Sequence, residues 1–254
     1  MAGKSNDRWT REEHILAFNL YCQTPFGRIH MRNPHIVELA RLIGRSVGAV
    51  SYKLSNFARL DPALQARGIR GSEHGAKGEE EVWREFSERP ESLAYESERL
   101  LAERLGKSIE EVADIETRDL PVEGIEREAT VRVRVNQSFF RRRIVSAYEF
   151  RCCVTGLAVP ELLVASHIVP WAQDAANRLN PRNGLCLNAL HDRAFDRGLM
   201  IVDDAMCVRF SPRLREKGGE GADWLLAFDG RPLHLPRKFS PDAALLARHR
   251  EQWT

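Results

Sequence analysis

Four polar residues in the second half of the chain could together hydrolyse a phosphodiester: His167, Asn183, His191 and Asp192. This reaction needs a base that activates water and a cation that offsets the negative charge of the transition state. A histidine at the end of a strand can accept the proton near neutral pH. An oxygen or nitrogen donor on a neighbouring helix can hold one divalent ion at the phosphate. The order and spacing of the four residues fit that layout.

The segments around these residues predict a small mixed domain, because the apolar residues change from an alternating to a helical period. In chain order we expect a strand (TVRVRV), a helix (NQSFFRRRIVSAYEF), a strand (RCCVTG), a strand and loop (ELLVASHIVPW), a short strand and helix (NPRNGLCLNALHDRAFDRG) and a hairpin (LMIVDDAMCVRF) that turns at Asp203 and Asp204. His167 would then end a strand, and His191 and Asp192 would begin a helix.

Longer motifs in this region resemble the HNH, or ββα-metal, nuclease family. V-A-S-H-I-V-P-W and N-P-R-N-G-L-C-L-N-A-L-H-D-R-A-F-D-R-G are similar to a branch of restriction endonucleases with N-G-x-x-L and F-D-x-G motifs. R-V-N-Q-S-F-F-R and C-V-T-G also match that branch. The likeness is strong over residues 130–212, and it implies a ββα-metal domain that cleaves double-stranded DNA with a divalent ion.

The resemblance implies a role for each matching residue. His167 would be the general base, and Asn183 would hold the backbone beside it. The helix would supply a metal ligand, and the motif leaves His191 and Asp192 as alternatives. His191 is therefore a candidate both for the catalytic set and for the metal site.

Ser166 departs from the family pattern, because many members have a metal-binding Asp or His just before the general base. A neutral hydroxyl is a weaker ligand, so Ser166 is only one candidate for the metal site, and Asp196 or Asp174 could substitute. One divalent ion is expected, with Mg as the default and Mn, Co, Ni or Zn as alternatives.

The N-terminal segment predicts three short helices. The first covers about residues 10–22, the second ends at Gly44, and the third ends before Asp61. W-T-x-E-E followed by L-A-x-x-I-G-R-S-x-x-A-V-x-x-K-L resembles the Myb-type or homeodomain-like helix-turn-helix pattern. The module is also similar to a helical domain that precedes HNH domains in modification-dependent restriction enzymes. That resemblance implies a DNA-reading third helix and a methylated base as its target.

Two sets of polar side chains are candidates for DNA contact, since helices in the major groove and arginines on phosphates are common modes of binding. The third N-terminal helix would present Arg45, Ser46, Ser51, Tyr52, Lys53, Ser55 and Asn56. The helix ahead of the nuclease motifs would present Gln137, Arg141 and Arg142. The alternatives are a helical bundle that only packs and a basic face that is only solvated.

Charge divides the chain into three parts. Residues 79–128 have a net charge of −10, whereas residues 1–78 and 129–254 each have +6. Two basic ends suit a protein that touches a polyanion at both. We expect an α+β protein with an N-terminal helical domain over 1–106, an acidic linker over 107–130 and an HNH domain over 131–254. The trailing helix of the first domain, broken near Pro90, is predicted to be a spacer or a dimer-facing element.

The 254 residues lack a long apolar run and an apolar leader, so a soluble, cytoplasmic protein without membrane contact is expected. The five cysteines form no C-x-x-C pair, which favours reduced core thiols over a zinc ribbon. Because one HNH site cuts one strand, a double-strand break predicts a homodimer on DNA. The alternatives are a sequence-specific or nicking nuclease of a mobile element and a DNA-binding regulator whose HNH fold no longer cleaves.

Overall fold

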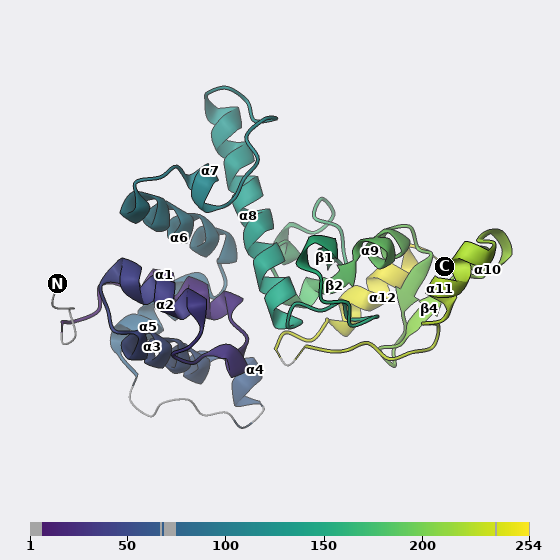
Figure 1. The fold of residues 1–254 in the computed structure, drawn as a ribbon, viewed down its shortest axis with the longest axis horizontal. Helices are drawn as coiled ribbons and strands as arrows, with labels where there is room; N and C mark the ends of the chain where they lie inside the picture. Colours follow the sequence, from purple (N-terminus) through teal and green to yellow (C-terminus); the bar gives the residue numbers. More distant parts are fainter. Residues whose placement is uncertain (1–6, 67, 69–74, 237, 254) are drawn as a thin grey trace. The chain divides into compact units, whose positions relative to one another are not determined.

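The protein, seen in a computed structural model that describes residues 7–66, 68, 75–236 and 238–253, forms two compact units (Figure 1). The first unit is Met1–Phe139 and the second is Phe140–Thr254. The first is helical and the second combines short strands with helices, so the predicted α+β class is confirmed. Among the described helices, none is long and apolar enough to cross a membrane.

The first unit is built from helices. They are α1 (Arg11–Gln23), α2 (Pro34–Ile43), α3 (Val47–Leu60), α4 (Pro62–Gln65), α5 (Lys77–Phe86), α6 (Pro90–Leu105), α7 (Ile109–Val112) and the first part of α8 (Ile125–Ala147), with a short 3-10 helix, η1 (Phe26–Arg28). The three predicted N-terminal helices are present as α1 to α3. The predicted break near Pro90 separates α5 from α6.

Local sequence explains where these helices begin and end. The Thr10 hydroxyl accepts from the Glu13 amide at 3.2 Å, and the Glu13 carboxylate accepts from the Thr10 amide at 3.0 Å. This reciprocal cap satisfies two amides that the first turn of α1 would otherwise leave unpaired. Gly44 ends α2 with φ of 71°, a left-handed conformation that a side chain disfavours. Ser46 then caps α3 by accepting from the Ala49 amide at 3.1 Å.

The core of the first unit lies where α1 packs against α3, α5 and α6. Phe18 contacts Phe57 and Trp83, with ring centroids 4.9 and 5.2 Å apart. Leu93 and Leu100 of α6 are buried in the same unit. The spacer prediction for the trailing helix is therefore wrong, because α5 and α6 complete the core of the helical unit. The alternative, a dimer-facing element, stays a prediction.

The strand predicted at TVRVRV is also wrong, because residues 130–135 lie within α8. Val131 and Val135 are buried one turn apart, whereas Val133 between them is 41% exposed. The valines therefore follow a helical period rather than the alternation of a strand. The start of α8 also lies in the predicted acidic linker, and the compact units divide between Phe139 and Phe140. The predicted domain limits at 106 and 131 stay a prediction.

The second unit contains two antiparallel pairs of strands. Its elements are the end of α8, β1 (Leu163–His167), β2 (Gly184–Asn188), α9 (Ala189–Asp196), β3 (Met200–Val202), β4 (Val208–Phe210), α10 (Pro212–Lys217), α11 (Asp223–Leu226) and α12 (Ala243–Glu251), with 3-10 helices η2 (Pro160–Leu162), η3 (Ala175–Asn177), η4 (Pro181–Asn183) and η5 (Glu220–Ala222). β1 pairs with β2, with Leu163 opposite Asn188 and His167 opposite Gly184. β3 pairs with β4 across the predicted turn at Asp203 and Asp204.

The strand predicted at RCCVTG is wrong, because this segment forms a tight turn. The Gly156 amide donates to the Cys152 carbonyl at 2.8 Å, and the Cys152 amide donates to the Leu157 carbonyl at 2.9 Å. Gly156 has φ of 75°, which a turn of this kind requires. The Cys153 amide still donates to the Cys186 carbonyl of β2, so the turn is attached to the sheet.

Candidate active site

The last two residues of β1 direct their side chains to opposite faces of the β1–β2 pair, as consecutive residues of a strand do. His167 stacks on Phe140 of α8, with ring centroids 3.8 Å apart and planes 9° apart. Ser166 is buried on the other face, where its hydroxyl lies near Asp192 of α9. The strand therefore lies between the imidazole and the helix carboxylate, whereas the spacing of the two residues predicts that they share one pocket.

The surroundings of His167 determine its protonation. Its Nε2 lies 2.9 Å from the Arg178 carbonyl, and its ring meets Trp171 edge-on with centroids 5.6 Å apart. Since a carbonyl can only accept, Nε2 must hold the proton and Nδ1 keeps a lone pair. Burial lowers the pKa of His167, against a smaller opposite effect of the Arg178 carbonyl. The imidazole is thus neutral near pH 7 and can accept a proton through Nδ1.

Asn183 holds the backbone that follows His167. Its side-chain nitrogen donates to the carbonyls of Val169 and Asn177, both at 3.1 Å, and its side-chain oxygen accepts from the Val169 amide at 2.8 Å. The Ile168 amide donates to the Asn183 carbonyl at 3.0 Å. The side chain is fully buried, and its hydrogen bonds hold the loop after β1 in place.

An acidic pair lies on α9. Asp192 and Asp196 are one turn apart and therefore project from the same side of the helix. Burial raises the pKa of both carboxyls, and the charge of Asp192 raises that of Asp196 further. The Ser166 hydroxyl opposes the rise in the pKa of Asp192, yet it does not reach hydrogen-bond geometry, and its Oγ has no hydrogen-bond partner among the residues that the structure describes.

These oxygen atoms fit a hard divalent cation. Two crowded carboxylates and an unpartnered buried hydroxyl are donors that Mg or Mn would accept, and a cation would remove their mutual repulsion. In the described part of the chain, no three His, Cys, Asp or Glu side chains are grouped closely enough to hold a metal ion. The acidic pair would thus be completed by the Ser166 hydroxyl, by water or by a phosphate oxygen, which is common for Mg.

His191 does not face the acidic pair, although it precedes Asp192. One residue turns an α-helix by about 100°, and His191 lies fully buried among the rings of Phe210, Trp224 and Phe228, with centroids 6.2, 5.3 and 5.5 Å away. Burial lowers its pKa to about 4. The placement counts against His191 as a catalytic residue or ligand, and Asp192 is the other candidate donor on α9.

Asp174, the other carboxylate considered for the metal, already has partners. It accepts from the Asn177 side chain at 2.9 Å and pairs with Arg248 of α12 at 3.1 Å. It therefore secures the loop between β1 and β2. Asp196 is the alternative that the structure places beside Asp192.

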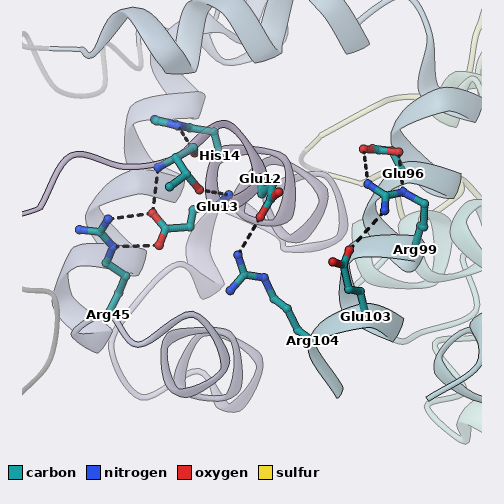
Figure 2. Close-up of polar contacts among 9 residues, drawn as sticks. Glu12, Glu13, His14, Arg45, Glu96, Arg99, Glu103 and Arg104 are labelled. Atoms are coloured by element: carbon teal, nitrogen blue, oxygen red, sulfur yellow. Dashed lines mark hydrogen bonds and ion pairs between the residues drawn. The ribbon is translucent and has the colours of Figure 1, made fainter. Parts of the chain in front are cut away.

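Three side chains predicted to contact DNA from α3 are buried instead. Arg45 pairs with Glu13 at 2.8 Å (Figure 2). Lys53 and Asn56 both bond the buried Glu79 carboxylate of α5. Because these groups are used inside the helical unit, the expectation that they face DNA is corrected: they hold α3 against α1 and α5.

The remaining predicted DNA contacts lie at the surface to different extents. Tyr52 is 55% exposed, Ser46 is exposed as the cap of α3, and Ser51 is half-buried. On α8, Gln137 and Arg141 are exposed and Arg142 is half-buried. The Arg141 guanidinium donates to the Leu163 carbonyl at 2.6 Å and to the Pro160 carbonyl at 3.2 Å, so it supports the start of β1.

A neutral histidine at the end of β1, a buried asparagine that holds the loop, and carboxylates on the helix after β2 together define a ββα domain of the nuclease type. Residues 152–203 match the family model described as HNH endonuclease, and this stretch is an HNH endonuclease domain. The match spans β1, β2, α9 and β3. It indicates a hydrolase that acts on nucleic acid. No curated protein matches the chain.

Some contacts of the candidate site are not predicted by any sequence motif. The Phe140 ring under His167 and the Arg178 carbonyl at its Nε2 come from segments well separated from β1. Two exposed arginines, Arg193 of α9 and Arg197 directly after it, also have no role predicted from the sequence. The repeated Asp-Arg pair at a spacing of four could have indicated them, since it places both acids and both arginines in rows along the helix.

Proposed function

We propose that the chain is a DNA endonuclease that depends on a divalent metal ion and reacts at the free edge of β1. One observation supports this most: Ser166 and His167, consecutive on the strand, place an acidic oxygen-rich site on one face and a neutral imidazole on the other. In the described chain β1 pairs with β2 alone, so no strand covers its other edge. A phosphodiester along that edge could be reached from both faces.

The residues divide the chemistry in this proposal. Nδ1 of His167 takes the proton of the attacking water, while Nε2 stays bonded to the Arg178 carbonyl and keeps the ring oriented. Asn183 keeps the loop in place through its three hydrogen bonds. Asp192, Asp196 and Ser166 would hold the metal ion. Such an ion, when bound, supplies positive charge against the transition state and the leaving oxygen.

In this proposal the protein is a restriction enzyme that acts on double-stranded DNA, and its helical unit recognises the DNA sequence that is cut. The exposed Tyr52 and the half-buried Ser51 on α3 support a smaller reading surface than the sequence suggested. A methylated base as target follows from the resemblance of the N-terminal module. A homodimer follows from the need for one active site per strand. A nicking or sequence-specific nuclease of a mobile element would use the same chemistry.

A second candidate function is a DNA-binding protein whose HNH domain does not cleave. Two observations favour it: Ser166 replaces an acidic or imidazole ligand, and His191 is turned into an aromatic core. Both reduce the donors available to a metal ion. This candidate predicts DNA binding without any metal-dependent cleavage.

Digestion of plasmid DNA tests the two candidates. Plasmids that contain methyladenine, methylcytosine or neither would be incubated with the full chain and with Mg, Mn, Co or Ni in turn. We expect cleavage with at least one metal, reduced roughly 100- to 10,000-fold by His167→Ala, as for loss of a general base. His234→Ala, which alters an exposed histidine of the same unit, is the control and should cleave normally. Cleavage by His167→Ala at the normal rate would contradict the proposal.

A further inference from the structure

Most arginines around the candidate active site already have partners within the second unit. Arg182 pairs with Asp242 at 3.3 Å, Arg209 pairs with Asp203 at 2.7 Å, and Arg248 pairs with Asp174 at 3.1 Å. Each of these cations is compensated by a carboxylate of the protein. They have a structural use that does not require a ligand.

Arg193 and Arg197 of the α9 segment differ from these. Both are exposed, and neither forms a hydrogen bond or an ion pair through its side chain with any residue that the structure describes. Each follows an acid directly: Arg193 follows Asp192, and Arg197 follows Asp196. The charge of Arg193 favours the ionised form of both carboxyls, and that of Arg197 favours ionised Asp196. The two arginines therefore lie next to the acidic pair but form no ion pair with it.

The position of the arginines is fixed by the buried side of α9. Phe195 is fully buried and stacks on His249, with centroids 3.7 Å apart. Ala194 is buried as well, so the helix cannot turn about its axis. At 100° per residue, Arg193 lies on the solvent side of Asp192. Arg197, the exposed cap residue directly after α9, extends this row beside Asp196. A nucleic-acid strand bound at Asp192 and Asp196 would have to run past Arg193 and Arg197.

We propose that Arg193 and Arg197 bind phosphates of the nucleic-acid backbone on either side of the scissile one, and so position the strand at the acidic pair. The planar guanidinium offers a fork of donors that matches two phosphate oxygens, and its charge is permanent. This inference rests on the proposed function, because the scissile phosphate is placed at Asp192 and Asp196. Both arginines are positioning residues in this role.

Salt dependence of binding tests the contact without any cleavage. A short fluorescent DNA duplex would be titrated with the full chain in EDTA, between about 50 and about 200 mM salt. Each lost phosphate contact lowers the slope of log affinity against log salt by about 0.9, so R193A/R197A should lower it by roughly 2. The matched control is R213A/K217A, which removes two exposed cations of α10 at the same spacing. The control should leave the slope unchanged.

Cleavage kinetics separate positioning from a general effect of charge. R193A/R197A should raise KM with an unchanged pH profile, and R193K/R197K should restore part of the affinity because the charges return. Equal slopes for the two double alanine variants would overturn the inference. If the wild type cleaves and R193A/R197A binds with the wild-type slope, the inference alone fails. If the wild type fails to cleave with every metal that is tested, the proposed nuclease function fails. The slopes still show whether Arg193 and Arg197 contact the phosphates.

Discussion

His249 of α12 lies flat on Phe195 of α9, with planes 2° apart and centroids 3.7 Å apart. Its Nε2 lies 3.2 Å from the Phe195 carbonyl, so the same ring also bonds the helix backbone. α12 lies outside residues 152–203, the stretch that matches the HNH model. The helix that holds the acidic pair is thus supported by a segment that the family motif does not include.

This stack predicts how stability depends on pH. Burial lowers the pKa of His249 to about 4, below its ordinary 6.5. Between these values the unfolded chain binds a proton that the folded chain excludes, so stability is full above pH 6.5 and falls as the pH drops toward 4. His249→Phe keeps a flat ring without a titrating group. It should reduce the loss in unfolding free energy between pH 7 and pH 5 by about 2 kcal/mol, measured by urea denaturation. An unchanged loss would contradict the stack as a source of pH sensitivity.

Gly198, directly after the Arg193–Arg197 row, should resist substitution. Its φ is +63°, and an added Cβ would lie 2.2 Å from the Trp253 ring. Gly198→Ala should cost about 1–3 kcal/mol from backbone strain, with a further part from the ring contact. Adding Trp253→Ala to Gly198→Ala should restore only the part of the stability that is lost to the contact with the Trp253 ring. Gly221→Ala, which meets nothing within 4 Å, is the control and should be nearly neutral in thermal denaturation.

The helical unit allows a direct comparison of a buried and an exposed ion pair (Figure 2). Arg45 and Glu13 are both buried, whereas Arg99 bonds Glu96 at the surface at 2.9 Å. Arg45→Ala leaves a buried carboxylate without its cation and should cost roughly 3–5 kcal/mol. Arg99→Ala should cost less than about 1 kcal/mol. A small effect of Arg45→Ala on stability, together with a large loss of DNA affinity, would restore the DNA-contact role for Arg45.

The ligand on α9 can be decided by two substitutions at neighbouring positions. His191→Phe replaces a buried imidazole within a cluster of aromatic rings, and its Nε2 has no hydrogen-bond partner in the described part of the chain. It should keep metal-dependent cleavage and near-normal stability. Asp192→Asn removes a charge from the acidic pair and should abolish cleavage at low metal concentration. The opposite pattern in cleavage and in metal titration would reassign the ligand to His191.

Predictions from sequence succeeded where the signal is local. The start of the first helix near residue 10, the end of the second helix at Gly44 and the order β1, β2, α9 depend on neighbouring residues, and the structure shows each of them. The strand predicted from the valines at 131, 133 and 135 is wrong because this sequence is compatible with both a strand and a helix. Only burial distinguishes the two, and burial depends on what packs against the segment.

The sequence by itself determined the chemistry available: a histidine, an asparagine and carboxylates at HNH spacing, because such spacing along the chain is read directly. The tertiary structure decided which way each group faces. His191 turned inward and Asp192 toward Ser166 because the aromatic cluster covers one side of α9. Arg45 and Lys53 are buried because they form ion pairs with Glu13 and Glu79, which lie 32 and 26 residues away in the sequence. Pairings at such separations arise from packing, and no local pattern specifies them.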